Sequence, residues 1–91
     1  MPYRKTYSRA DSNQKEIVKA LKKIPGIAVE LAHDDVLVGY KGRNYWYEIK
    51  TSEKARRRPK QEELDKFWPG HYKFVWSVEM ILEDLGITHN S

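Results

Sequence analysis

The sequence predicts an α/β domain: a small mixed β-sheet of about four strands flanked by helices, in the order α-β-β-β-α-β-α. Three segments repeat apolar residues at helical spacing, and four short apolar or alternating runs stand between turn residues. The chain has 91 residues, of which 40% are hydrophobic, enough for one modest core. We therefore expect residues 1–91 to form a single domain, with 1–9 as a loose basic arm.

The first expected helix covers about residues 12–23, where apolar residues recur on one face. Asp11 or Ser12 is the expected N-cap. Pro25 and Gly26 follow the helix and would end it.

Three strands are expected next, at residues 27–31, 36–38 and 44–50, with 39–43 as the hairpin connection between the last two. Side chains alternate between the two faces of a strand. In the third strand this period places Tyr45, Tyr47 and Ile49 on one face, and Trp46, Glu48 and Lys50 on the other.

The basic segment 51–59 has no regular pattern and is expected to be a loop. Residues 60–68 are expected to form a helix with Leu64, Phe67 and Trp68 as its apolar side.

A fourth strand is expected at residues 72–76, followed by a helix with Ser77 as N-cap and Gly86 at its C-terminal end. A helical connection between the third and fourth strands allows these two to run parallel, whereas the hairpins are antiparallel. The predicted sheet is therefore mixed.

Composition excludes several classes of protein. The chain has no cysteine, which excludes disulfides and thiolate metal sites, and no paired histidines that would favour zinc. It has no apolar segment of the roughly 20 residues that a membrane span needs, and no apolar run after its first residues. We expect a cytoplasmic protein with no membrane partner.

Positive charge is concentrated in two blocks, which predicts a polyanionic partner. Residues 1–23 carry a net charge of +5 and residues 52–60 one of +4, whereas the whole chain carries +4. An ordinary solvated surface explains the run 56–58 about equally well. The candidate nucleic-acid contacts are Lys54, Arg56, Arg57, Arg58 and Lys60.

The chemically most informative pattern is Asp35 followed, after a strand-length gap, by Glu48-Ile49-Lys50. Glu48 and Lys50 share a strand face, and Asp35 would arrive from a neighbouring strand. Mg²⁺ prefers oxygen ligands and keeps several waters, so Asp35, Glu48 and the Ile49 carbonyl would suffice to bind it. Lys50 would orient or deprotonate the attacking water. The pattern favours metal-assisted phosphodiester cleavage, with no small-molecule substrate.

Two alternatives stay open for these residues. Asp34 could be the ligand in place of Asp35, although Asp35 directly abuts the apolar strand. A surface ion pair is the commoner meaning of an isolated Glu-x-Lys, and only the surrounding pattern disfavours it for Glu48 and Lys50.

Residues 35–40 and 42–50 resemble the core of the PD-(D/E)xK nuclease superfamily. More narrowly, they resemble the VRR-NUC family in its short stand-alone form from phages and prophages. The likeness spans about residues 9–86 and extends to 13–18, Gln61, 68–71 and 77–79. The chain departs from the family at Asp34, where proline often precedes the metal-binding aspartate.

The resemblance implies a restriction-endonuclease-like core and an endonuclease that depends on Mg²⁺ or Mn²⁺, with Asp35, Glu48 and Lys50 in the site. It further implies that Gln14, and less strongly Glu16, joins the site from the first helix.

Two further implications of the resemblance concern Gln61 and the substrate. Gln61 would bind phosphate or water. Stand-alone members resemble Holliday-junction resolvases, which implies a homodimer acting on branched DNA in a bacterial or phage-infected cell. Two alternatives remain: a non-catalytic nucleic-acid-binding module that uses the arm and the loop 56–58, and a small adaptor for an acidic partner.

Overall fold

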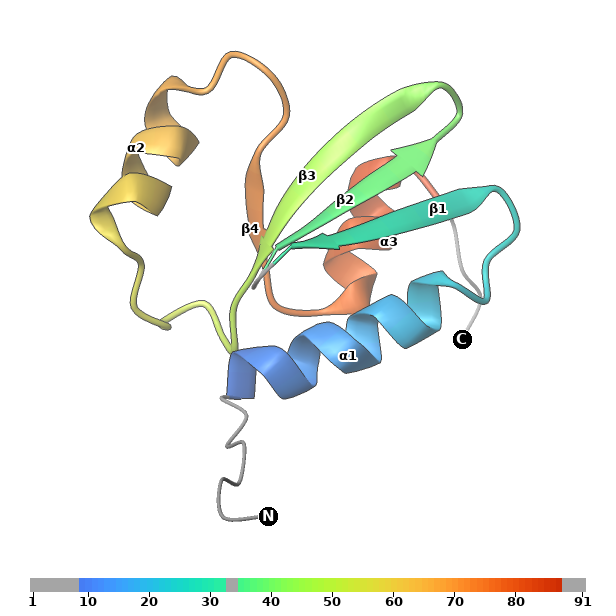
Figure 1. The fold of residues 1–91 in the computed structure, drawn as a ribbon, viewed down its shortest axis with the longest axis horizontal. Coiled ribbons are helices and arrows are strands. Elements are labelled where there is room, and N and C mark those ends of the chain that lie inside the picture. The colour runs from blue at the N-terminus through green and yellow to red at the C-terminus, as the bar shows by residue number, and fades with distance from the viewer. Residues whose placement is uncertain (1–8, 33–34, 88–91) are drawn as a thin grey trace.

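The computed structural model describes residues 9–32 and 35–87, and its elements follow the predicted order (Figure 1). The elements are α1 (Arg9–Leu21), β1 (Ile27–Ala32), β2 (Asp35–Tyr40), β3 (Arg43–Ile49), α2 (Pro59–Phe67), β4 (Lys73–Val75) and α3 (Val78–Leu85). The sheet order is β1-β2-β3-β4, with antiparallel pairs up to β3 and β4 parallel to β3. The predicted α/β class and mixed sheet are confirmed.

The hydrophobic core lies between one face of the sheet and the two helices α1 and α3. Strand alternation places Val36 and Val38 of β2 on that face, opposite Tyr47 and Tyr45 of β3. The helices close it with Ile17, Val18, Leu21, Ile81, Leu82 and Leu85. Figure 1 shows α2 to the side of β3 and β4, away from α1 and α3. Because side chains alternate along a strand, Asp35 and Glu48 leave the other face of the sheet.

The β2–β3 connection is tighter than predicted. Residues 39, 40 and 43 pair within the strands, which leaves Lys41 and Gly42 as the turn. Both have positive φ, 52° and 79°, a combination typical of the hairpin turn whose twist matches the flanking strands. The expected loop 39–43 was wrong because β2 runs to Tyr40.

The predicted caps are confirmed at α3 and wrong at α1. Ser77 Oγ accepts a hydrogen bond from the Met80 backbone N–H at 3.3 Å, and Gly86 ends α3 in the left-handed conformation. By contrast, α1 begins at Arg9, so Asp11 and Ser12 lie inside the helix and neither is its N-cap. The remainder of the expected arm, residues 1–8, lies outside the described residues.

The apolar side predicted for the helix 60–68 is not packed into the core. Leu64 is half-buried, but the Phe67 and Trp68 side chains are 73% and 47% exposed. The residue of α2 that is buried is polar, Gln61. The predicted helix was placed correctly, except that it runs from Pro59 to Phe67 and lies outside the α1–α3 layer. In residues 9–32 and 35–87, no helix has the length and apolar character to cross a membrane.

Candidate active site

Two carboxylates face each other across adjacent strands. Asp35 opens β2, and its register partner in β3 is Glu48. Side chains of directly opposed residues leave the same face of the sheet, with Cβ atoms roughly 4.5–5.5 Å apart. The structure thus brings together the two acids that the sequence placed thirteen residues apart.

Each carboxylate accepts a hydrogen bond from an aromatic side chain. The Trp46 indole N–H donates to Asp35 Oδ2 at 2.8 Å, and the Tyr72 hydroxyl donates to Glu48 Oε1 at 3.2 Å. The two rings meet edge to face, with centroids 4.7 Å apart. Burial, followed by the negative charge of Glu48, raises the pKa of Tyr72, so its hydroxyl stays a donor. One aromatic pair therefore orients both acids.

Lys50 and Gln61 form a buried polar contact beside these carboxylates. Glu48, Lys50 and Gln61 are 6%, 8% and 8% exposed. Lys50 Nζ donates to Gln61 Oε1 at 2.7 Å, and the same oxygen accepts the Arg58 backbone N–H at 3.0 Å. Such burial disfavours an exposed surface ion pair, because burying charged groups is costly and is typical of functional sites.

The start of α1 contacts the strands through their backbone. Gln14 Nε2 donates to the Asp35 carbonyl at 3.1 Å, which places Gln14 beside the site. Asn13 Nδ2 donates to the carbonyls of Lys50 and Trp76 at 2.8 and 3.2 Å. Glu16 is exposed. Sequence reasoning missed the roles of Asn13 and Tyr72; two adjacent amides on a sheet-facing helix end were the available signal for Asn13.

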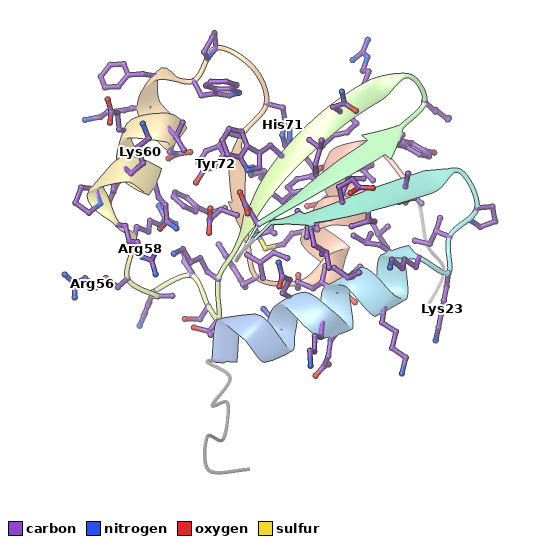
Figure 2. All side chains as sticks on the ribbon, viewed as in Figure 1. Lys23, Arg56, Arg58, Lys60, His71 and Tyr72 are labelled. Carbon is purple, nitrogen blue, oxygen red and sulfur yellow. The ribbon has the colours of Figure 1, made fainter. Side chains whose placement is uncertain are left out.

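The site opens into a pocket of about 220 Å³ that carries both charge signs. Its lining residues are Asp35, Trp46, Glu48, Arg58, Lys60, Gln61 and Leu64. Figure 2 shows Arg56, Arg58 and Lys60 at the α2 end of the molecule, with Lys23 at the opposite end of the view. The basic segment therefore borders the acids, whereas the end of α1 does not.

The five predicted nucleic-acid contacts are not equivalent. Lys54, Arg56, Arg58 and Lys60 are exposed. Arg57 is half-buried, and its guanidinium lies 4.0 Å from the centroid of the Phe74 ring. Arg57 therefore packs the loop onto the sheet, and four of the five cations are exposed to solvent.

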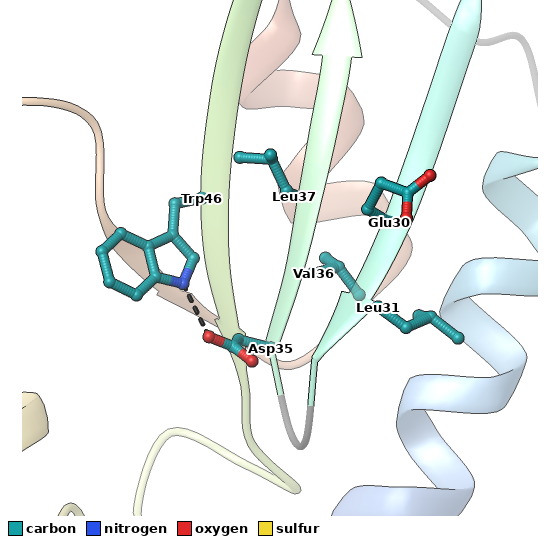
Figure 3. Close-up of a pocket in the computed structure, with 6 residues that line it drawn as sticks. All are labelled: Glu30, Leu31, Asp35, Val36, Leu37 and Trp46. Carbon is teal, nitrogen blue, oxygen red and sulfur yellow. Dashed lines mark hydrogen bonds between the residues drawn. The ribbon is translucent and has the colours of Figure 1, made fainter.

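A second pocket, of about 370 Å³, is lined by Asp35 and Trp46 together with residues of β1 and β2 (Figure 3). Its remaining lining residues are Glu30, Leu31, Val36 and Leu37. Asp35 and Trp46, joined by their hydrogen bond, line both pockets.

The residues present fit a hard divalent cation with few protein ligands. The described part of the chain contains no group of three His, Asp or Glu side chains that could hold a metal. It does contain the opposed Asp35 and Glu48, whose carboxylates would hold such an ion from one face of the sheet. The Ile49 side chain is buried in the core, and the role of its carbonyl stays a prediction. Asp34 lies outside the described residues.

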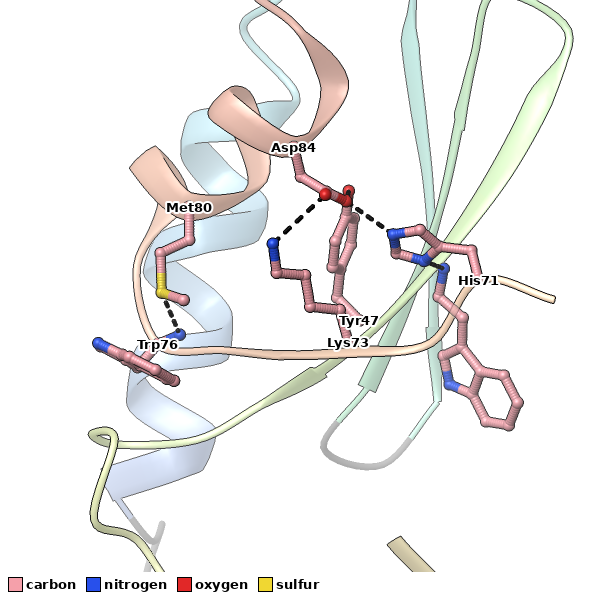
Figure 4. Close-up of polar contacts among 7 residues, drawn as sticks. Tyr47, His71, Lys73, Trp76, Met80 and Asp84 are labelled. Carbon is pink, nitrogen blue, oxygen red and sulfur yellow. Dashed lines mark hydrogen bonds and ion pairs between the residues drawn. The ribbon is translucent and has the colours of Figure 1, made fainter. Parts of the chain in front are cut away.

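A second polar network lies on the core side of β3, around Asp84 of α3 (Figure 4). Asp84 Oδ2 accepts hydrogen bonds from the Tyr47 hydroxyl at 2.7 Å and from His71 Nε2 at 2.6 Å, and Lys73 Nζ lies 3.3 Å from Oδ1. His71 Nδ1 accepts the Trp46 backbone N–H at 3.1 Å, so Nε2 carries the proton. This network supports the strand that presents Trp46.

Comparisons of the chain with protein-family models, with curated proteins and with solved structures found no match. The resemblance to the VRR-NUC family is therefore still a prediction from the residues.

Proposed function

We propose that this chain is a metal-dependent endonuclease that hydrolyses DNA phosphodiester bonds. The observation that carries the proposal is the register pair of Asp35 and Glu48, on one face of the sheet, with buried Lys50 next to it. Two carboxylates that leave one face of the sheet at opposed positions can each supply an oxygen to one cation. A non-catalytic fold has no need of that arrangement.

A bound Mg²⁺ or Mn²⁺ would polarise the scissile phosphate and help to neutralise the charge of the departing oxygen. The chain's own groups supply the rest. Asp35 and Glu48, oriented by Trp46 and Tyr72, fix where the cation binds. Lys50, held by Gln61, presents an ammonium on the same side and would position a water or a phosphate oxygen.

The proposal retains Gln61 as the residue that holds Lys50, which differs from the direct phosphate contact that the family resemblance implies. Gln61 Oε1 already accepts two hydrogen bonds, from Lys50 Nζ and from the Arg58 backbone. Gln14 acts on the Asp35 backbone in the same indirect way. Both are positioning residues in this proposal.

Branched DNA, such as a Holliday junction, is the proposed substrate, and a homodimer of the VRR-NUC type is the proposed assembly. One site cuts one strand, so resolving a four-way junction takes two symmetric sites. The exposed cations Arg56, Arg58 and Lys60 at the edge of the pocket would hold the DNA backbone.

A non-catalytic nucleic-acid-binding module is the second candidate, because the same exposed cations would serve it equally well. The two candidates differ in metal dependence. A binding module loses affinity as salt rises but has no requirement for Mg²⁺.

The test is cleavage of a labelled four-way DNA junction beside a linear duplex of the same sequence, with Mg²⁺ and with EDTA. The proposal expects cuts in the junction only, and only with the metal. Equal cutting of both DNAs would retain the nuclease and remove the preference for branches. Binding without cuts under Mg²⁺ and under Mn²⁺ would overturn the nuclease in favour of the binding module.

A further inference from the structure

We propose that Trp68 is a stacking platform for one unpaired nucleobase of the DNA, beside the pocket that contains Asp35 and Glu48. The proposal deepens the proposed function, on which it rests, by naming the feature of branched DNA that the protein recognises. Every base has an aromatic face, so stacking on an indole recognises an unpaired base of any sequence.

The first observation is that two aromatic side chains are exposed to solvent. Phe67 and Trp68 are among the four large apolar side chains exposed in the described residues, together with Leu31 and Leu37. Phe67 is the last residue of α2 and Trp68 is its C-cap, and the start of the same helix lines the pocket that contains Asp35 and Glu48. They are the aromatic members of the set, and aromatic faces are what bases stack on.

The second observation is that the Trp68 ring is held in place. It meets the Trp46 ring edge to face, with centroids 5.4 Å apart and planes at 90°. A Cβ added to Gly70 would lie 3.0 Å from the indole Nε1, so the ring also lies against the glycine backbone. An exposed ring that is already ordered loses little conformational entropy when a base stacks on it.

The third observation is position. Trp68 contacts Trp46, and Trp46 donates its indole hydrogen bond to Asp35. A base on Trp68 is therefore two side chains away from the proposed metal ligand. Arg58 precedes the first turn of α2 and Trp68 follows its last residue, so the cations of the pocket would hold phosphates further along the same DNA strand than the stacked base.

The charges along α2 distinguish where a phosphate and where an uncharged base would bind. The start of α2 is basic, with Arg58 and Lys60, its middle carries the exposed acids Glu62, Glu63 and Asp65, and one exposed cation, Lys66, lies in its last turn. A phosphate backbone lying along the acidic part would be repelled. An uncharged base is not repelled, so the cations fit the DNA backbone and the ring at the far end of α2 fits the base.

The experiment measures binding in EDTA, which prevents metal-dependent cleavage. The probes are a short DNA duplex and the same duplex with one unpaired thymine at its centre. The 91-residue chain is compared with Trp68→Ala, Trp68→Phe and the control Phe67→Ala, which removes the neighbouring and more exposed aromatic ring. Circular dichroism checks that each variant folds, and sedimentation gives its oligomeric state.

We expect wild type to bind the unpaired probe about tenfold more tightly than the duplex, and Trp68→Ala to lose that preference. Trp68→Phe should keep most of it, because a phenyl ring still stacks. Phe67→Ala should change it by about twofold or less. Equal losses in Trp68→Ala and Phe67→Ala would overturn the proposal in favour of general apolar contact. A Trp68→Ala variant that turns a dimer into monomers would overturn it in favour of a subunit interface.

The failure of this proposal differs from the failure of the proposed nuclease. Metal-dependent cutting with no effect of Trp68→Ala on probe preference would remove the stacking platform and leave the enzyme. A Trp68-dependent preference without cutting under any metal would leave a module that binds unpaired bases and would remove the enzyme.

Discussion

Two polar networks lie on opposite faces of strand β3. They contain the same kinds of residue but arrange the carboxylates differently. On one face, Glu48 opposes Asp35, so two negative charges share a site. On the other face, Tyr47 donates to Asp84, a single carboxylate that also has His71 and Lys73 around it. The Asp84 network satisfies its charge within the protein. The Asp35–Glu48 pair instead places two carboxylates at opposed positions on one face, where the proposed cation would bind.

The pKa directions agree with this difference. Burial alone would raise the pKa of Asp84, but hydrogen bonds from Tyr47 and His71 and the charge of Lys73 lower it below its usual value. A lowered carboxyl pKa stabilises the fold above the pKa of the unfolded chain, and this stabilisation is lost as the pH falls below about 3.8. The Asp84 network is therefore a stabilising element at neutral pH.

The largest effect that we expect is on cleavage, when one acid of the Asp35–Glu48 pair is removed. Glu48→Ala removes one of the two opposed carboxylates and should lower junction cleavage by a factor of about 10³ or more. DNA binding in EDTA should be unchanged, because binding depends on the cations of the loop and α2. Glu30→Ala, an exposed acid on the neighbouring strand β1, is the control and should cut normally. Wild-type cleavage by Glu48→Ala would remove the site assignment.

The next effect is on stability, at the other network. Asp84→Asn should lower the free energy of unfolding by about 1–2 kcal/mol, because the hydrogen bonds from Tyr47 and His71 lose their charged acceptor. Urea denaturation at pH 7 measures it. Glu83→Gln, an exposed neighbour on α3, should change the same quantity by less than about 0.5 kcal/mol. Equal changes in the free energy of unfolding for Asp84→Asn and Glu83→Gln would show that the Asp84 network stabilises the fold no more than an ordinary surface charge does.

Removing the charge of Glu48 should raise the free energy of unfolding, whereas removing the charge of Asp84 should lower it. In EDTA, Glu48→Gln should raise the free energy of unfolding by up to about 1 kcal/mol, because it removes like-charge repulsion and a buried charge while Oε1 still accepts from Tyr72. Mg²⁺ should then stabilise wild type and not the variant, by about 1.4 kcal/mol at ten times its dissociation constant. A Glu48→Gln variant as destabilised as Asp84→Asn would make Glu48 a structural residue.

The smallest expected effect is at alkaline pH, where both networks contribute a tyrosine. Burial is the first cause that raises the pKa of Tyr47 and of Tyr72, followed by their carboxylate partners. The folded chain keeps these protons while the unfolded chain releases them, so stability is lost as the pH rises above about 10. Tyr47→Phe and Tyr72→Phe should each show a shallower decline than wild type in urea denaturation.

The comparison between the two tyrosines sharpens this test, because lysine and arginine titration is common to all three chains. The change in slope should be larger for Tyr47→Phe, since Tyr47 is fully buried and Tyr72 is not. Identical slopes for wild type and both variants would show that neither hydroxyl is held in its protonated form by the fold.

The sequence by itself determined the element order, the faces of β3 and the caps of α3. Period-2 alternation fixes which side chains of 44–50 share a face, whatever the sheet around them. Ser77 and Gly86 act on backbone within a few residues, so their roles follow from local chemistry. The acids Asp35 and Glu48 were visible for the same reason, because a hairpin brings its two strands together in register.

Only the tertiary structure decided the contacts between segments distant in the chain. Tyr72 reaches Glu48 across a separation of 24 residues, and Asn13 reaches the carbonyls of Lys50 and Trp76 from the first helix. The exposure of Trp68 was decided in the same way: periodicity gave α2 an apolar side, but not whether the helix would lie on the sheet or beside it. Local pattern specifies which side chains point together, whereas packing of whole elements decides what they meet.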